Sequence, residues 1–175
     1  MAKKSNFLTL YHFTSTHHLE HWPILQQGLV GTDVPIAIDR PGPLAAVWLT
    51  SNPNPANQGW KDGSTVDKTE VRFTLRFRLP TFSLKKWSIY ASEQKVSREW
   101  YATLDKTGGG GSDNWWLFFG HVPAEDFVSI EVRQGHKYLP LGDIMADLNN
   151  PLTKALANRD PVHLLKSAVD RPPMR

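Results

Sequence analysis

The chain has 175 residues, of which 40% are apolar and seven are Trp, so it fits one globular domain with a sizeable core and not a disordered segment. It contains no Cys, which excludes disulfides, cysteine-ligated zinc and thiol nucleophiles. The net charge of +3 is compatible with an anionic ligand or nucleic acid, and equally with neither. Because no export signal follows residues 1–6 and no apolar run approaches a membrane span, we expect a cytoplasmic protein with no membrane partner.

The first predicted elements are two short strands. Residues 7–13 hold strand formers without a breaker, and the polar groups of His12 and Thr14 come at the far end of this strand. Residues 46–49 form a second apolar run, which ends in the hydroxyls of Thr50 and Ser51. Two strands that both end in hydrogen-bonding side chains predict a cleft at those ends.

Between these strands, residues 16–28 carry apolar side chains at three- and four-residue spacing, which predicts a helix. Ser15 or Thr16 can cap its start, and Gly28 is a natural cap for its end. Pro23 disturbs the pattern and fits the first turn of a helix better than its interior.

Residues 70–79 give the clearest pattern in the chain, because apolar side chains alternate with polar ones. This predicts a half-buried strand with Arg72, Arg76 and Arg78 together on its polar face. Shorter patterns predict strands at 86–90, 114–119 and 128–133, a helix over 92–104 capped by Ser92, and small helices near 141–148 and 161–169.

Long stretches rich in Pro, Asn and Gly separate these elements. Residues 31–45 and 52–68 are predicted loops, and loops of this length in a compact domain are often functional. Residues 108–112, four Gly followed by Ser, are similar to a flexible spacer, native or engineered.

The expected fold is α+β, with five to seven mostly antiparallel strands and the helices 16–28 and 92–104 packed beside them. We expect a single domain, with a core over residues 1–135 and a helical extension over residues 136–175.

The motifs Tyr11-His12-Phe13-Thr14, Gly28-Leu29 and Trp48-Leu49-Thr50-Ser51 resemble the N-terminal half of the ADP-ribosyltransferase superfamily. The nearest likeness is to the DNA-targeting ADP-ribosyltransferase toxins, and a looser one is to the RNA 2′-phosphotransferases. It covers residues 8–52 and, more weakly, 113–132. The resemblance implies a split, mostly antiparallel sheet, NAD as co-substrate, and transfer of ADP-ribose to a nucleic acid or protein acceptor.

The resemblance also implies a nucleotide site. His12 would hold a ribose hydroxyl of NAD, which suits a neutral imidazole that both donates and accepts. The backbone of Phe13 would bind the nicotinamide amide. The other expected members of the site are Tyr11, Thr14, Thr50 and Ser51, with Trp48 or Trp60 stacking on nicotinamide. Each has a plainer alternative: a His bonded to backbone, hydroxyls that cap strand ends, and core aromatic rings.

The catalytic acid departs from the family's pattern. The superfamily usually places a Glu at the start of a late strand, ahead of a Val-Pro turn, where it polarises the ribose hydroxyl and stabilises the oxocarbenium-like charge. Aligning Val122-Pro123 with that turn puts Trp115 near the Glu position. The nearest acids are Asp113 and Glu99, and both are kept as candidates. Catalysis is therefore left open, with a non-catalytic nucleotide- or protein-binding module as an alternative.

Three further groups of residues bear on function. The phosphotransferase alternative uses His12 with Arg98, whose guanidinium suits a phosphate. A strand face bearing Arg72, Arg76 and Arg78 is either a nucleic-acid contact or a solvated outer face. His17 and His21 have zinc-ligand spacing but no accompanying carboxylate motif, so we expect no metal site.

Overall fold

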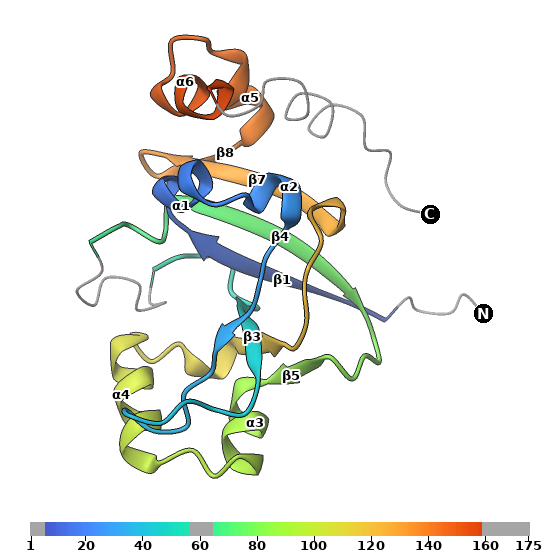
Figure 1. The fold of residues 1–175 in the computed structure, drawn as a ribbon, viewed down its shortest axis with the longest axis vertical. Helices are drawn as coiled ribbons and strands as arrows, with labels where there is room; N and C mark the ends of the chain where they lie inside the picture. Colours follow the sequence, from blue (N-terminus) through green and yellow to red (C-terminus); the bar gives the residue numbers. More distant parts are fainter. Residues whose placement is uncertain (1–5, 57–64, 159–175) are drawn as a thin grey trace.

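We analysed the protein through a computed structural model, which describes residues 6–56 and 65–158. Its fold is mixed α+β, as expected, but its sheet has eight strands and not five to seven, and every pairing in it is antiparallel (Figure 1). The strands are β1 (Phe7–Thr14), β2 (Thr32–Asp33), β3 (Ala45–Thr50), β4 (Val71–Arg78), β5 (Leu84–Lys86), β6 (Trp115–Phe118), β7 (Phe127–Gln134) and β8 (Lys137–Pro140). They are ordered β5-β6-β3-β1-β4-β7-β8, and β2 pairs with β3.

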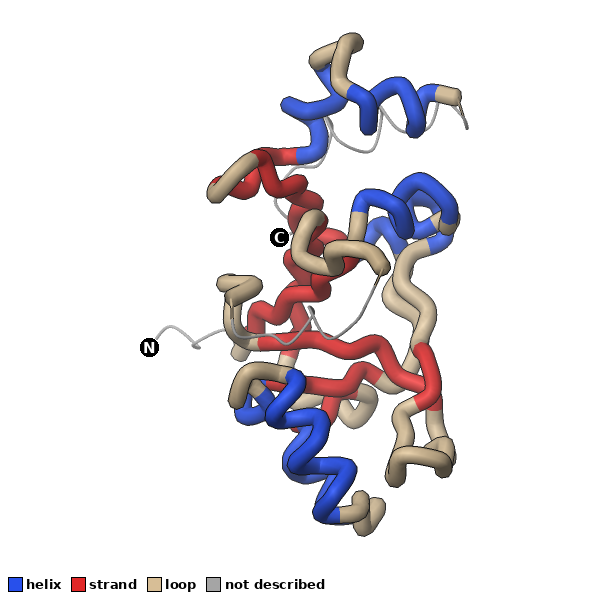
Figure 2. The backbone as a smooth tube through the Cα atoms, turned by 90° about the vertical axis from the view of Figure 1, so that its left-hand side faces the viewer, coloured by secondary structure: helices blue, strands red, loops and turns tan. Residues whose placement is uncertain are grey.

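The helices lie around this sheet in three groups (Figures 1 and 2). They are α1 (Thr16–His21), α2 (Ile24–Gln27), α3 (Trp87–Glu93), α4 (Arg98–Thr107), α5 (Leu141–Ala146) and α6 (Pro151–Ala157), with the short 3₁₀ turns η1 (Ser112–Asn114) and η2 (Ala124–Asp126). Within the described ranges, no helix has the length and apolar character needed to cross a membrane.

Strand pairing in the sheet is shortest between β1 and β3. β1 pairs with β4 along its whole length, from Phe7↔Arg78 to Thr14↔Val71. In contrast, β1 and β3 share one register pair, Tyr11↔Thr50. Figure 1 accordingly shows β1, β4, β7 and β8 as one group, with β3 and β5 below it beside α3 and α4.

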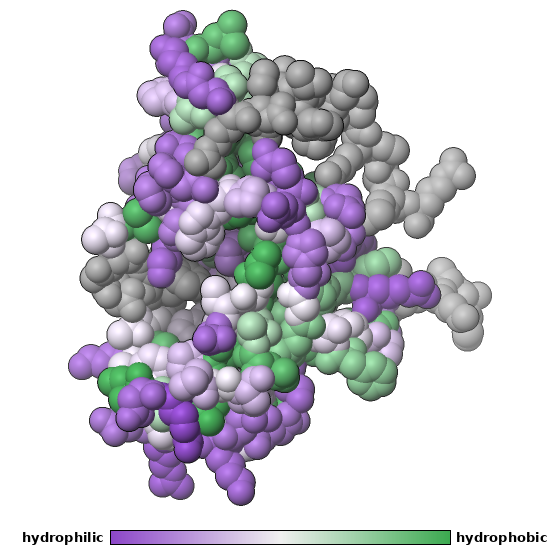
Figure 3. Space-filling model, in the orientation of Figure 1, coloured by the Kyte–Doolittle hydropathy of each residue, from purple (hydrophilic) through white to green (hydrophobic). Residues whose placement is uncertain are grey.

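The buried apolar residues form two clusters, and the larger one includes residues from both groups of strands. Alternation in β4 buries Val71, Phe73 and Leu75 completely, in a cluster that also includes residues of α1, α2, α5 and α6. The second cluster is more aromatic, and it joins α3, β3 and β6 through Trp87, Tyr90 and Trp115 among others. Figure 3 shows one face, on which hydrophilic residues predominate and hydrophobic residues form smaller groups near the middle and towards both ends.

The first predicted helix is broken in two. α1 begins as expected, with the Ser15 hydroxyl accepting a hydrogen bond from the His18 N–H at 3.1 Å. Pro23 is the N-cap of α2, and Gly28 is its C-cap. The break falls at Pro23 because this residue has no N–H to continue the ladder of α1.

The prediction for residues 86–104 was wrong at two boundaries. The expected strand over 86–90 ends at Lys86, because Trp87 and Tyr90 stand at helical spacing and are buried on one face of α3. The expected single helix from Ser92 is also wrong, since the chain turns at Lys95, whose φ is +53°. Ser97 caps α4 instead, accepting from the Trp100 N–H at 3.1 Å.

The remaining predictions were mostly confirmed. β4, β6 and β7 match the expected strands within a residue or two, and α5 matches the start of the helix expected near 141–148. β2, β8 and α6 were not predicted. The helix expected over 161–169 lies outside the described residues.

Candidate functional site

A cleft of about 350 Å³ lies where β1 and β3 part. β1 contributes His12 and Thr14 to its wall, β3 contributes residues 46–48, and α2 with its flanking residues between 22 and 32 completes it. Among the described residues that line it there is no Asp, Glu, Lys or Arg. Its chemistry is therefore that of apolar surface with a few uncharged polar groups.

His12 is fixed in this wall by a bond to the opposite strand. Its Nδ1 lies 2.9 Å from the carbonyl oxygen of Trp48. Because a carbonyl only accepts, we assign the proton to Nδ1, which leaves Nε2 as an acceptor in the neutral ring. Burial lowers the pKa of His12, the bond to Trp48 opposes this, and the nearby His18 lowers the pKa further. The ring is therefore neutral near pH 7.

Thr14 in the cleft wall is connected to Trp22 through His18, by a hydrogen bond and an aromatic stack. The Thr14 hydroxyl lies 2.8 Å from Nδ1 of His18. The ring of His18 stacks on Trp22, with centroids 4.3 Å apart and planes 8° from parallel. Trp22 lines the cleft and is 54% exposed, so part of its indole is accessible to a ligand. Sequence reasoning missed Trp22, and its position directly before the break at Pro23 was the available signal.

The Gly28-Leu29 and Val122-Pro123 motifs, far apart in sequence, are neighbours. Leu29 and Val122 exchange two backbone hydrogen bonds, at 2.8 and 3.0 Å. Gly28 has φ +91°, and a Cβ there would lie 2.0 Å from the Val122 carbonyl oxygen. This close approach leaves room only for Gly at position 28. The two hydrogen bonds hold Leu29 against the turn that precedes β7.

The expected meeting of Thr14 with Thr50 does not occur, because β1 and β3 are antiparallel. Thr50 lies beside Tyr11, is 1% exposed, and accepts from the Asn52 N–H at 3.1 Å. Ser51 is exposed, and its hydroxyl donates to Oδ1 of Asn114 at 3.3 Å. Both hydroxyls are thus bonded within the protein at the end of β3, Thr50 locally and Ser51 to a residue distant in sequence.

Tyr11 and Phe13 point to the other face of β1, because side chains alternate along a strand. Phe13 is 4% exposed, with its ring 6.2 Å from that of Tyr138. Trp48 lines the cleft but also packs in the aromatic cluster, 5.1 Å from Trp87 and 5.8 Å from Trp115 between ring centroids. The other stacking candidate, Trp60, lies outside the described residues.

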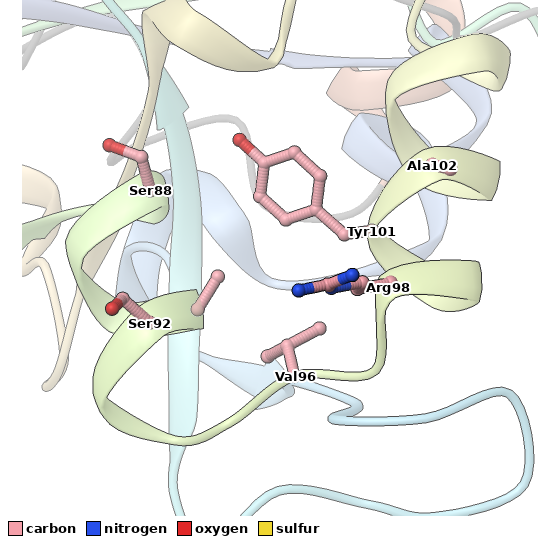
Figure 4. A pocket seen from close by; sticks show the side chains of 7 residues that line it. Ser88, Ser92, Val96, Arg98, Tyr101 and Ala102 are labelled. Atoms are coloured by element: carbon pink, nitrogen blue, oxygen red, sulfur yellow. The ribbon is translucent and has the colours of Figure 1, made fainter.

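The structure does not bring the candidate acids to His12. Trp115, at the position expected for the family's Glu, begins β6 and is 6% exposed. Asp113 is exposed in η1, and Glu99 is exposed in the first turn of α4. Neither lines the cleft. Arg98 lines a separate hollow between α3 and α4 (Figure 4).

The three arginines of β4 have different surroundings. Arg72 donates to Glu131 from Nε at 2.9 Å and to the Pro53 carbonyl from Nη1 at 2.8 Å. Its guanidinium also lies 4.3 Å from the ring centroid of Tyr138. Arg76 and Arg78 are exposed. All three lie on the sheet face opposite His12, because His12 pairs with Phe73 and not with an arginine of β4.

No family model matches the chain, and no curated protein matches it. Among solved structures, a chain described as EcPltA is similar with a TM-score of 0.41 and 13% sequence identity, over 79% of this chain and 84% of that one. A likeness of this strength carries no argument about fold family or function.

Proposed function

We propose that the chain is an ADP-ribosyltransferase-like protein that binds NAD in the His12 cleft. One observation carries this: His12 lies in a cleft without charged side chains, where burial lowers its pKa and its bond to Trp48 fixes which ring nitrogen carries the proton. A neutral imidazole whose Nε2 accepts is suited to a ribose hydroxyl. The sequence motif around His12 supports the same ligand.

The aromatic wall suits the other end of the same nucleoside. The nicotinamide ring of NAD is planar and cationic, and such a ring is attracted to the face of an indole. Trp22 is partly exposed and stacks on His18, which is bonded to Thr14. A volume of about 350 Å³ is near the lower end for ligand pockets, so this cleft would take the nicotinamide riboside end and leave the pyrophosphate outside.

Transfer of ADP-ribose to a nucleic acid or protein needs a carboxylate near the ribose, and the described wall has none. Asp113 and Glu99 stay proposals for that role. A non-catalytic nucleotide-binding module is the second candidate, and the uncharged wall favours it. The phosphotransferase alternative has less support, because Arg98 does not line the cleft with His12.

Two measurements on the full chain test these functions. Titration calorimetry with NAD should give a Kd between micromolar and millimolar, about −4 to −8 kcal/mol. The absence of heat at millimolar NAD would overturn the proposal. Release of free nicotinamide would then separate an enzyme from a binding module. An enzyme should lose this release in Asp113→Asn or in Glu99→Gln, while a binding module releases none in any form.

A further inference from the structure

His18 does not line the His12 cleft, but it contacts two residues that do. Its Nδ1 lies 2.8 Å from the hydroxyl of Thr14, which is 4% exposed. Its ring is stacked on Trp22, with centroids 4.3 Å apart. A change in the charge of His18 therefore reaches a ligand in the cleft through these two neighbours.

The groups around His18 offer no negative charge to balance a proton on its ring. The charged and titratable residues on the elements beside it are His12 on β1, His17, Glu20 and His21 on α1, Asp67, Lys68 and Glu70 ahead of β4, and Lys154 on α6. Across residues 6–56 and 65–158, no carboxylate is paired with His18.

The carboxylates among these residues are engaged elsewhere or face away. Asp67 is paired with Arg133 at 2.6 Å, and Glu70 accepts from the N–H and the hydroxyl of Thr16 at 2.9 and 2.8 Å. Glu20 is two positions from His18 on α1, a spacing that does not bring side chains together on a helix. A proton on His18 would therefore be an uncompensated positive charge beside the cleft.

Protonation leaves both contacts of His18 in place. A neutral imidazole can accept the Thr14 hydroxyl hydrogen at Nδ1, and an imidazolium can donate from Nδ1 to the oxygen of the same hydroxyl. Stacking on Trp22 also persists, because an imidazolium is attracted to the face of an indole. The added charge thus stays next to two residues of the cleft wall.

A cationic ligand ring and a protonated His18 would compete for the same indole. The nicotinamide ring is cationic, and its attraction to Trp22 would come from the π electrons of the indole. Two cations that share one indole also repel each other, and no carboxylate among the described lining residues offsets this repulsion. An uncharged aromatic ring beside Trp22 meets no such repulsion.

We propose that His18 is a specificity-determining residue of the cleft: when neutral it admits a cationic nicotinamide ring, and when protonated it turns the same cleft toward uncharged rings. This inference rests on the proposed NAD site. Burial, His17 and Lys68 lower the pKa of His18, so the ring is neutral near pH 7 and gains its proton below about pH 6.5. Because a cationic ring binds the neutral form better, the complex holds fewer protons than the free protein, and affinity should rise with pH.

The test compares two ribosides that differ in the charge of the ring: nicotinamide riboside, which is cationic, and benzamide riboside, which is uncharged. Neither carries a phosphate, so the charge of the ring is the main difference between them. Titration calorimetry on the full chain at about pH 7.5 and about pH 5 gives each Kd on both sides of the His titration. We expect nicotinamide riboside to bind about three- to tenfold more weakly in acid, and benzamide riboside to bind equally at both pH values.

Variants assign this difference to one ring. His18→Gln and His18→Asn replace the imidazole with an amide that does not titrate, so both should abolish the difference between the ribosides in acid. His17→Gln is the matched control, because it removes the neighbouring ring, which is exposed and stacks on His21. This variant should keep the difference.

The results separate this inference from the proposed function. No binding of either riboside at either pH would overturn the NAD site and the role of His18 together. Three results would overturn the role of His18 alone: an affinity for nicotinamide riboside that does not change with pH, equal weakening of both ribosides in acid, or an undiminished difference in the two His18 variants.

Discussion

The Nδ1–H of His12 donates to the carbonyl oxygen of Trp48 across the point where β1 and β3 part, with 2.9 Å between the two atoms. These strands share one register pair, Tyr11↔Thr50, so the side-chain bond is a further connection between the two groups of strands. The same imidazole lines the cleft. His12 therefore has two separable roles: Nδ1 holds Trp48, and Nε2 is available to a ligand.

The first prediction separates these roles with two substitutions of His12. In His12→Asn, the side-chain NH₂ takes the place of Nδ1–H and can still donate to Trp48, but Nε2 is lost. We expect a near-normal melting temperature and NAD binding weakened by about 1–3 kcal/mol. His12→Ala loses both groups, so its free energy of unfolding should also fall by about 1–3 kcal/mol. Calorimetry and urea unfolding measure the two effects, and wild-type NAD affinity in His12→Asn would remove His12 from the ligand site.

The second prediction concerns acid stability. Burial is the main cause of the lowered pKa of His12, and burial, His17 and Lys68 lower the pKa of His18. In the unfolded chain both rings titrate near their ordinary value of about 6.5. Below that pH the unfolded state binds more protons than the folded state, so the free energy of unfolding should fall between about pH 7 and pH 5.

Single substitutions measure how much each of the two His rings contributes to the loss of stability in acid. Urea unfolding at several pH values should show a shallower loss in His12→Asn and, separately, in His18→Gln. His136→Gln is the control, because it removes a His that is exposed on the surface. In this variant the free energy of unfolding should change with pH as it does in the wild type. A wild-type slope in both test variants would contradict the assignment.

Local patterns could predict most of the strands but not how they meet. β4 was predictable because burial of Val71 and Phe73 requires the alternation that the sequence shows. The direction of pairing between β1 and β3 leaves no local trace, and the predicted meeting of Thr14 and Thr50 depended on it. The turn at Lys95 was also hidden, since a positive φ is usually announced by Gly or Asn.

The cleft itself was predicted only in part. His12, Thr14 and Trp48 line it as expected. The role of Trp22 depends on its stacking with His18, a contact made possible by the short α1 helix and the break before Pro23. Such a contact follows from the placement of two side chains in space, which residue type and spacing do not specify.

The third prediction tests the contact between the two short motifs. In Gly28→Ala the new Cβ would meet the Val122 carbonyl oxygen at 2.0 Å and the Ala124 N at 2.8 Å. The backbone there, with φ +91° and ψ −163°, is also one that only Gly adopts readily. We expect the free energy of unfolding to fall by at least about 2–3 kcal/mol, measured by urea unfolding.

Gly135→Ala is the matched control for that substitution. Gly135 also has a positive φ, +62°, but a Cβ there meets nothing within 4 Å. Gly135→Ala should lower the free energy of unfolding by only about 1–2 kcal/mol, because Ala disfavours the left-handed backbone conformation. Equal losses in the two variants would mean that backbone conformation, and not the close approach to Val122, explains the need for Gly28.

The fourth prediction concerns the arginines of β4 and a nucleic-acid partner. Arg76 and Arg78 are exposed, whereas Arg72 is bonded to Glu131 and Pro53. If this face follows a phosphate backbone, binding of DNA or RNA should weaken with salt, with a log-log slope of about −0.7 to −0.9 per phosphate contacted. Changing Arg76 and Arg78 to Gln should reduce that slope by up to about two contacts and leave stability intact.

Arg72→Gln is the control, and it should behave in the opposite way. Its side chain and that of Glu131 are only 18% and 20% exposed, so the substitution leaves a largely buried carboxylate without its partner. We expect unfolding to become easier by about 1–3 kcal/mol, with little change in the salt slope. Because the arginines lie on the face opposite His12, His12→Asn should not affect polynucleotide binding. Binding that is absent at low salt, or unchanged in the double variant, would leave this face as solvated surface, and a protein acceptor would then fit the proposed transferase better.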